Sequence, residues 1–487
     1  MNDYGASATR GALWLGTSSA TSNLLQFLQL VFLARILEPH EVGIVAILAI
    51  FLALIDMVTD LGMANAIIQK RTLLQHEVSS AYWFNVSLGI AFAAIFLSIA
   101  HPLSEAYDQP ALALPFALAA VVFMIMPHGL IFKGLLERSQ QFKPVAIVEA
   151  ASGGISFTVT ILTALCGLGP VSFVLGRISA SMTKTALFQV YGRRIQRRIA
   201  LSFSFRSASG LIRFGGIQTI DALVSYVHNT AGSLIVGMVS NVTQLAGFNL
   251  AYNLTVNLPG TINTVLNRSI FPSFSRLQAE RERIIGAYMK LVSITGLVNF
   301  PILIGMGLIS NELVFVLFGE RWLWIVAIVQ ALAFSGCARA ITNPIGTLFM
   351  GIGKPSIPLY INILRTALVV GGSLLAAPKW GAIGIAYVLA GSAIVTLAAN
   401  YVVLFRFFRL PLRLFARTIF GPALLVLPMV LGVLLVQFLL RDSGWHPIFL
   451  LITSVITGVS LFVGTLCLAR DKTSLEVLRL LSAARLR

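Results

Sequence analysis

Apolar runs of about 20 residues, the length a helix needs to cross a ~30 Å hydrocarbon core, recur along the whole chain. The chain has 487 residues, of which 57% are hydrophobic and only 11% are charged. A soluble domain has roughly 25% charged residues, so this surface cannot face water on all sides. The sequence therefore predicts an all-α polytopic membrane protein and not a soluble enzyme with an anchor.

The breaks between apolar runs predict about fourteen transmembrane helices. They are expected at 12–33, 42–67, 79–100, 111–132, 144–166, 170–190, 211–238, 244–271, 288–310, 322–351, 356–377, 381–405, 417–440 and 446–468. The N-terminus lacks a short apolar core that ends in a small-residue cleavage site, so we expect the first span to be retained.

The net charge of +17 would suggest nucleic acid as a partner of a soluble protein. Here the basic residues lie between apolar spans instead of forming one patch, so no nucleic-acid binding is predicted. Most of the 35 Lys and Arg fall on one side of the membrane if both termini are cytoplasmic. The outside connections then hold only Arg35, Arg321, Lys379 and Arg441. We therefore predict a multi-pass chain with both termini in the cytoplasm.

The first and second sets of six predicted helices resemble each other at an offset of roughly 210 residues, as in duplicated transporters. The matching positions are Gly43 and Gly247, Pro127 and Pro344, Lys143-Pro144 and Lys354-Pro355, and Gly169 and Gly381. Repeats with an even number of spans begin on the same side, so we expect a pseudo-twofold axis along the membrane normal. The predicted parts are a six-helix lobe at 1–198, a second at 199–409, and two additional helices with a basic cytoplasmic tail at 410–487.

Several ionisable side chains are predicted to lie within the spans, where each costs at least ~2.5–3.5 kcal/mol. They are Asp56, Asp60, Glu149, Arg177, Asp221, Arg339 and Arg365. A guanidinium donates in pairs to phosphate oxygens, so we hypothesise a cationic cavity that binds an anionic lipid headgroup through Arg177, Arg339 and Arg365.

The four acids are candidates for ion coupling or gating, with H⁺ or Na⁺ as the coupling ion. A competing interpretation is structural: the arginines pair with acids such as Glu149 or Asp221, and Asp60 and Glu149 reach the interface or cap a helix.

Enzymatic chemistry is not predicted. The three cysteines, Cys166, Cys337 and Cys467, lie in or at the ends of apolar spans and give neither a disulfide framework nor a metal-ligand spacing. The outside connections are too short to hold a soluble catalytic domain. We expect no catalytic residue, no metal and no cofactor other than a coupling ion.

The segment LARILEPHEVGIVAI, followed by DLGMANAIIQK, resembles the hallmark of the polysaccharide transporter (Wzx-type flippase) family, within the multidrug/oligosaccharidyl-lipid/polysaccharide exporter superfamily. The matching residues are Leu33, Ala34, Arg35, Leu37, Pro39, Gly43, Asp60 and Gly62. LLERSQQFKPVAIVE, at 135–149, is similar to the colanic-acid exporter branch. Asn229, Gly232 and Met238 stand where that branch often has charged residues, so no charged site of the seventh span is carried over.

This resemblance implies a flippase of the bacterial inner membrane that works by alternating access. Its substrate would be an undecaprenyl-pyrophosphate-linked oligosaccharide, such as an exopolysaccharide or an O-antigen (lipopolysaccharide) repeat unit. Membrane lipids and a polysaccharide polymerase or copolymerase are the expected partners, and the chain is expected to be a monomer.

Two alternatives stay open. A cation-coupled multidrug antiporter on the same fold would favour an acidic, aromatic-lined cavity. A membrane-embedded polysaccharide polymerase or ligase would favour a large outer loop with clustered Arg, His or acidic residues.

Overall fold

The computed structural model describes residues 2–469, with gaps at 61–62, 71–72, 355 and 442–444 and with interrupted gaps within 196–229 and 261–279. Throughout the described residues the regular structure is helical. Seven of the described helices are long and apolar enough to cross a membrane, or eight if a bent pair is counted as one span. The predicted fold class, an all-α polytopic membrane protein, is confirmed. The predicted spans 211–238 and 244–271 fall partly outside the described residues, and a helix occupies each of the other predicted positions.

The chain folds into two compact units, Met1–Ala246 and Gly247–Arg487. The predicted parts 1–198, 199–409 and 410–487 remain a prediction. The helices of the first unit are α1 (Asn2–Ile36), α2 (Pro39–Asp60), α3 (Met63–Gln69), α4 (Gln75–Ala106), α5 (Ala113–Ile125), α6 (Pro127–Arg138), α7 (Phe142–Leu165) and α8 (Val171–Gly192).

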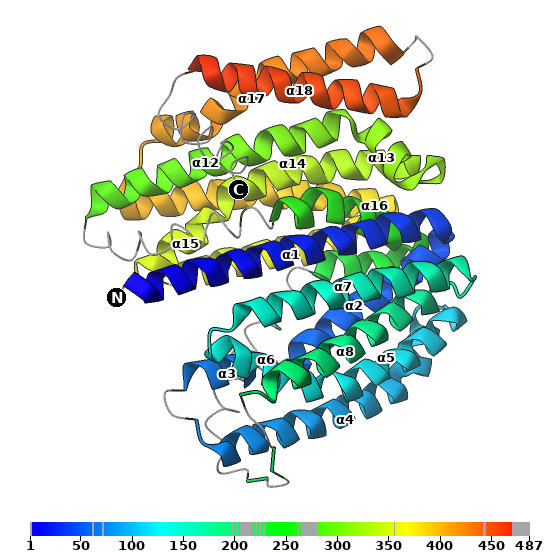
Figure 1. Cartoon of the computed structure of the whole chain (residues 1–487). Helices are drawn as coiled ribbons and strands as arrows, with labels where there is room; N and C mark the ends of the chain where they lie inside the picture. The colour runs from blue at the N-terminus through cyan, green and yellow to red at the C-terminus, as the bar shows by residue number, and fades with distance from the viewer. Residues whose placement is uncertain are drawn as a thin grey trace. The chain divides into compact units, whose positions relative to one another are not determined.

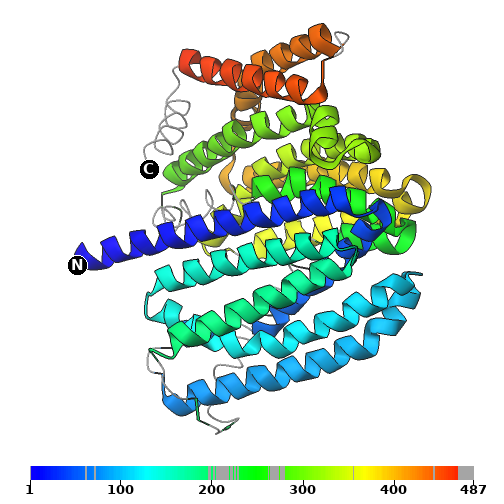
Figure 2. The same ribbon diagram turned by 45° about the vertical axis from the view of Figure 1, so that its right-hand side comes forward.

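Within the first unit, α7 packs between α1 and α8, and α5 packs against α4 and α8 (Figures 1 and 2). Between α4 and α5, the rings of Phe96 and Phe116 stack with centroids 4.7 Å apart, and Phe123 meets Phe96 edge-on. Such aromatic contacts hold helices together where lipid removes the hydrophobic driving force between them.

The predicted span 42–67 is helical on both sides of residues 61–62, which lie outside the described residues. The structure describes α2 up to Asp60 and α3 from Met63. The short α3 packs against α6, and the Arg138 guanidinium of α6 donates to the backbone carbonyls of Ile67 and Lys70. A cation that satisfies the last carbonyls stabilises the end of a helix, so α3 has its own C-terminus beside α6.

The second unit contains most of α10 (Val242–Tyr252), a π-helical turn at Asn253–Asn257, and a bundle that begins with α12. The bundle helices are α12 (Arg281–Leu308), α13 (Ser310–Phe318), α14 (Val326–Thr342), α15 (Pro344–Gly351), α16 (Ser356–Phe408), α17 (Leu412–Arg441) and α18 (Pro447–Ala469). In the bundle, α12 packs on α14 and α17, α14 packs on α16, and α17 packs on α18.

Two of the residue pairs that define the predicted repeat, Pro127/Pro344 and Gly169/Gly381, have similar local structure in both units. Pro127 and Pro344 each begin a new helix, α6 and α15, directly after a preceding apolar helix. A proline is compatible with the first turn of a helix but not with its interior. Between α5 and α6 the chain bends by 46°.

Gly169 and Gly381 both have a positive φ, of 53° and 57°. Because side chains disfavour this conformation, glycine is needed where the chain turns. Gly169 lies between α7 and α8, and Gly381 divides α16 into two helices, at the boundary predicted between 356–377 and 381–405.

Candidate functional site

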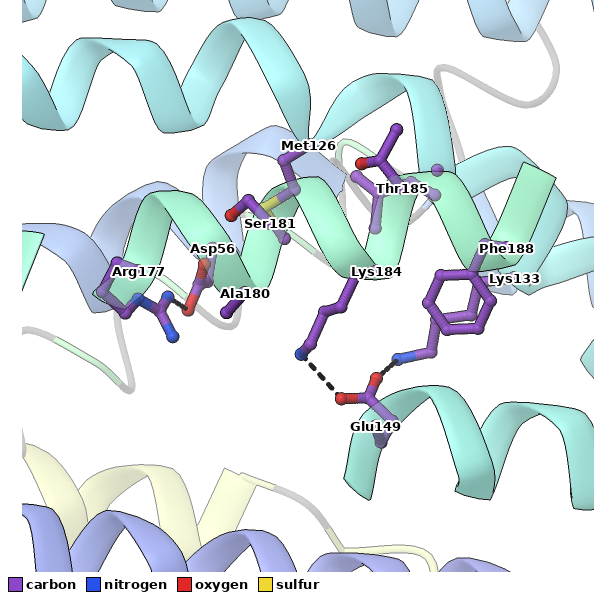
Figure 3. Close-up of a pocket in the computed structure, with 12 residues that line it drawn as sticks. Asp56, Met126, Lys133, Glu149, Arg177, Ala180, Ser181, Lys184, Thr185 and Phe188 are labelled. Atoms are coloured by element: carbon purple, nitrogen blue, oxygen red, sulfur yellow. Dashed lines mark hydrogen bonds and ion pairs between the residues drawn. The ribbon is translucent and has the colours of Figure 1, made fainter. Parts of the chain in front are cut away.

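A pocket that is partly open to solvent, with about 480 Å³ of empty space, lies in the first unit among α2, α6, α7 and α8 and beside Met126. Polar and charged side chains from these four helices point toward it (Figure 3). The pocket is lined by Asp56, Met126, Gly129, Leu130, Lys133, Glu149, Arg177, Ala180, Ser181, Lys184, Thr185 and Phe188.

An ion pair joins α2 to α8 at one end of the pocket. The Arg177 Nη2 donates to Asp56 Oδ2 (Figure 3), and the two side chains are 25% and 39% exposed. The Arg177 Nε atom is buried and has no hydrogen-bond partner among the described residues. This guanidinium therefore keeps one unused donor while its charge is compensated.

A second cluster of charges centres on Glu149 of α7. Lys133 of α6 donates to its Oε1 over 3.1 Å, and Lys184 of α8 donates to its Oε2 over 2.6 Å (Figure 3). The Glu149 side chain is only 22% exposed, and two counterions offset the cost of its burial. With the ion pair at Arg177, the pocket contains three cations and two carboxylates, so it carries one excess positive charge.

Lys133 and Lys184 were not among the predicted site residues, because they lie at or near the cytoplasmic ends of the predicted spans 111–132 and 170–190 and were counted with the basic residues of that side. Lys184 follows Arg177 by seven residues, which is two turns of a helix, so both lie on the same face of α8. This spacing was the available signal. Lys133, in contrast, reaches Glu149 through the packing of α6 on α7, and no periodicity indicates that contact.

Arg339 and Arg365 lie together in the second unit, on α14 and α16. Arg339 Nη1 donates to the Tyr252 hydroxyl over 3.3 Å. Arg365 interacts electrostatically with both Arg339 and Tyr252, so the two guanidinium groups repel each other. In the part of the chain that the structure describes, no carboxylate forms an ion pair with either arginine.

The predicted site residues therefore separate into two kinds. Arg177 pairs with Asp56, a different acid from those proposed as its partner, whereas Arg339 and Arg365 form a cationic pair without an acid among the described residues. Asp60 is the last residue of α2, and its side chain, like the whole of Gly62 and Asp221, lies outside the described residues. The roles assigned to these residues stay predictions.

Three of the family-motif residues, Arg35, Pro39 and Gly43, lie at or near the junction of α1 and α2. Arg35 is exposed in the last turn of α1, and Pro39 begins α2. Gly43 is buried, and a side chain there would collide with the backbone of Val242. Its role is therefore close packing. In the described residues, no group of three His, Cys, Asp or Glu side chains could hold a metal ion.

A family profile, several relatives and several solved structures match this chain. A family profile described as "Polysaccharide biosynthesis protein" matches residues 32–327. The lipopolysaccharide biosynthesis protein WzxC of Escherichia coli K12 is 31% identical over 375 residues, which cover 77% of this chain and 76% of that protein. The teichuronic acid biosynthesis protein TuaB of Bacillus subtilis is 24% identical over 470 residues, covering 96% of this chain and 97% of TuaB.

Among solved structures, the fold is similar to that of the lipid II flippase MurJ in an inward closed conformation. The TM-score is 0.72 at 13% identity, and the match covers 93% of this chain and 97% of that one.

Proposed function

The chain belongs to the family of polysaccharide biosynthesis proteins, and from this premise we propose that it is a flippase. Its substrate is an undecaprenyl-pyrophosphate-linked oligosaccharide, an exopolysaccharide or O-antigen repeat unit, which it moves across the bacterial inner membrane. The names of WzxC and TuaB, which both refer to the biosynthesis of cell-surface polysaccharides, support this substrate class. The MurJ-like fold supports transport by alternating access.

The observation that carries the proposal is the excess of positive charge at membrane depth. Arg339 and Arg365 lie near each other without a carboxylate partner among the described residues, on helices that are apolar enough to span the membrane. Each uncompensated cation there costs at least ~2.5–3.5 kcal/mol. A pyrophosphate supplies the missing negative charge and accepts paired hydrogen bonds from guanidinium groups.

In the proposed cycle the pyrophosphate-sugar headgroup enters from the cytoplasm and binds these cations, and the chain then opens outward while the lipid tail stays in the bilayer. No covalent bond is made or broken. Arg177 is a weaker candidate for the phosphate contact, because Asp56 already compensates its charge. Asp56 and Glu149 remain candidates for coupling to H⁺ or Na⁺, since protonation of either would release the cations that it now holds.

The environment of the transporter follows from the same proposal. The distribution of Lys and Arg supports cytoplasmic termini. A polymerase or copolymerase would receive the lipid-linked unit on the outer face, and the chain would act as a monomer.

The proposal is tested by translocation in proteoliposomes. A fluorescent undecaprenyl-pyrophosphate oligosaccharide is placed in the inner leaflet, and its accessibility to an external quencher is followed under imposed H⁺ and Na⁺ gradients. We expect the accessibility of the lipid to rise only in liposomes that contain the protein. Arg365→Gln should slow the rate of this rise about tenfold or more, since a hydrogen bond to a charged group contributes about 1.5–3 kcal/mol.

Arg413→Gln, at an exposed position near the start of α17, is the matched control and should keep the wild-type rate. Absence of transport under every gradient would contradict the flippase and favour the multidrug antiporter.

A further inference from the structure

We propose that Asn249, Asn253 and Asn257, together with Tyr252, form a strip that recognises the sugar hydroxyls of the headgroup, next to the cations that hold its pyrophosphate. This inference rests on the proposed function. It assigns the sugar specificity to one face of α10 and of the π-helical turn that follows it.

The three asparagines form a ladder of side-chain hydrogen bonds. The Asn253 amide donates to Asn249 Oδ1 over 2.6 Å, and the Asn257 amide donates to Asn253 Oδ1 over 2.9 Å. Residues four apart lie on the same face of a helix, and eight residues advance it by about 12 Å. The ladder is therefore a continuous polar strip along a membrane helix.

The ends of the ladder are chemically different. Among the described residues, neither the Asn249 side-chain nitrogen nor the Asn257 side-chain oxygen has a hydrogen-bond partner. The strip thus offers free donors at one end and a free acceptor at the other. A sugar hydroxyl both donates and accepts, so a chain of hydroxyls can bind along such a strip in one direction.

The opposite face of the same segment is buried and packs on the bundle of the second unit. Leu250, Leu254 and Thr255 are at most 1% exposed, and the π-helical turn contacts α14. Asn249 and Asn253 are half-buried, and Asn257 is exposed. Carboxamides that face lipid would lose their hydrogen bonds with water, so this polar face belongs to a water-filled space.

The π-helical turn is a second observation that points to a ligand. A π-helical segment costs regular backbone hydrogen bonds and occurs often at functional sites. Here the Asn253 side chain also donates to the Asn249 carbonyl over 2.9 Å, which holds the widened backbone in place. Across this turn the Asn257 amide donates to Asn253, so the polar face continues through the π-helical segment.

Tyr252 connects the strip to the cations. Its hydroxyl accepts the hydrogen bond from Arg339, and it also interacts electrostatically with Arg365. The ladder therefore runs beside the arginines proposed to bind pyrophosphate, and the first sugars after the phosphate would meet the amides. The aromatic ring of Tyr252, stacked on Phe248 with centroids 5.9 Å apart, is fixed at this junction.

The test separates sugar recognition from phosphate recognition by comparing two lipids. Binding of bare undecaprenyl pyrophosphate, and of the undecaprenyl-pyrophosphate oligosaccharide isolated from host cells depleted of the chain, is measured with the full chain in nanodiscs. We expect the wild type to bind the oligosaccharide lipid more tightly. Asn257→Leu should weaken that binding about fivefold to tenfold, the loss of one to two hydrogen bonds, and leave binding of the bare lipid unchanged.

Val256→Leu, at the adjacent half-buried position, adds similar apolar bulk and should change neither affinity. Asn257→Gln, which keeps the carboxamide, should recover part of the loss. Equal losses for both lipids, or no loss for either, would overturn the sugar-recognition strip while leaving the flippase in place. Failure of the wild type to bind either lipid would overturn both proposals.

Discussion

Asp56 and Arg177 compensate each other across α2 and α8, so removal of either charge leaves the other without its counterion. We expect Arg177→Gln and Asp56→Asn each to lower the free energy of unfolding by about 1–2 kcal/mol, because both side chains are partly exposed and solvent screens the loss. The double variant should lose less than the sum of the two. Thermal denaturation of the purified protein in detergent measures the three values, and strictly additive losses would argue against the pair.

Glu149 is the shared counterion of Lys133 and Lys184, so its neutralisation should have a larger effect. We expect Glu149→Gln to lower stability by about 2–4 kcal/mol, since Lys133 and Lys184 lose their shared carboxylate in a half-buried site. Lys184→Gln in the same chain should restore part of the loss. Glu105→Gln, whose side chain is 70% exposed, is the control and should be nearly neutral. The same denaturation assay tests this, and equal effects of the two Glu variants would contradict it.

For individual residues, the sequence identified the charged side chains within apolar runs but could not show which of them form ion pairs. Arg177, Arg339 and Arg365 were predicted to share one cavity, and this shared cavity stays a prediction. Arg339 and Arg365 lie together in the second unit, whereas Arg177 belongs to the first. The competing interpretation, that an arginine pairs with an acid, holds for Arg177, but its partner is Asp56 and not one of the acids given as examples. Asp56 is 121 residues away in the chain, so only the tertiary structure reveals this pair. The asparagine ladder was visible as an i, i+4 repeat, yet its significance depends on the adjacent arginines.

Among the elements, the break within α16 depends on one backbone conformation. Gly381 has φ 57° and ψ −143°, a region that is nearly exclusive to glycine. We expect Gly381→Ala to lower the free energy of unfolding by about 1–3 kcal/mol. Gly391→Ala, in the same helix and facing open space, should be neutral or stabilising by up to ~1 kcal/mol. A melting temperature of Gly381→Ala equal to that of Gly391→Ala would contradict the strained turn.

Helix positions followed from the sequence, whereas only one of three helix breaks did. Gly381 marks the break predicted between 356–377 and 381–405, because glycine permits positive φ. The breaks at Pro127 and Pro344 were not predicted, since both prolines lie inside the predicted spans 111–132 and 322–351, although proline lacks the N–H that a helix interior needs. The contact of Arg138 with the last carbonyls of α3 was also not predicted, because no local pattern near α3 reveals it. The 46° bend after α5 is likewise a matter of packing, since proline alone gives no angle.

For the molecule as a whole, the fold class was accessible from the chain because long apolar runs leave few alternatives to a helical bundle. The family was accessible through the resemblance of residues 33–62 to a known family motif. The family profile over residues 32–327 and the likeness to MurJ agree with that prediction. The boundary between the two compact units, in contrast, could not be predicted from the sequence. It falls between Ala246 and Gly247, within α10, and a boundary inside a helix does not change the local composition.

The orientation of the whole chain is testable at the two ends of α8. Cys166 is exposed just before this helix and Arg194 is exposed just after it, so the two lie on opposite sides of any membrane that α8 spans. The positive-inside rule places Cys166 outside, because the basic run near Arg194 is retained in the cytoplasm. Two chains are compared in intact cells: one keeps Cys166 as its sole cysteine, and the other carries Arg194→Cys as its sole cysteine. A membrane-impermeant maleimide should label the first before permeabilisation and the second only afterwards. The reverse order would invert the topology and, with it, the direction in which the cationic site first meets its lipid.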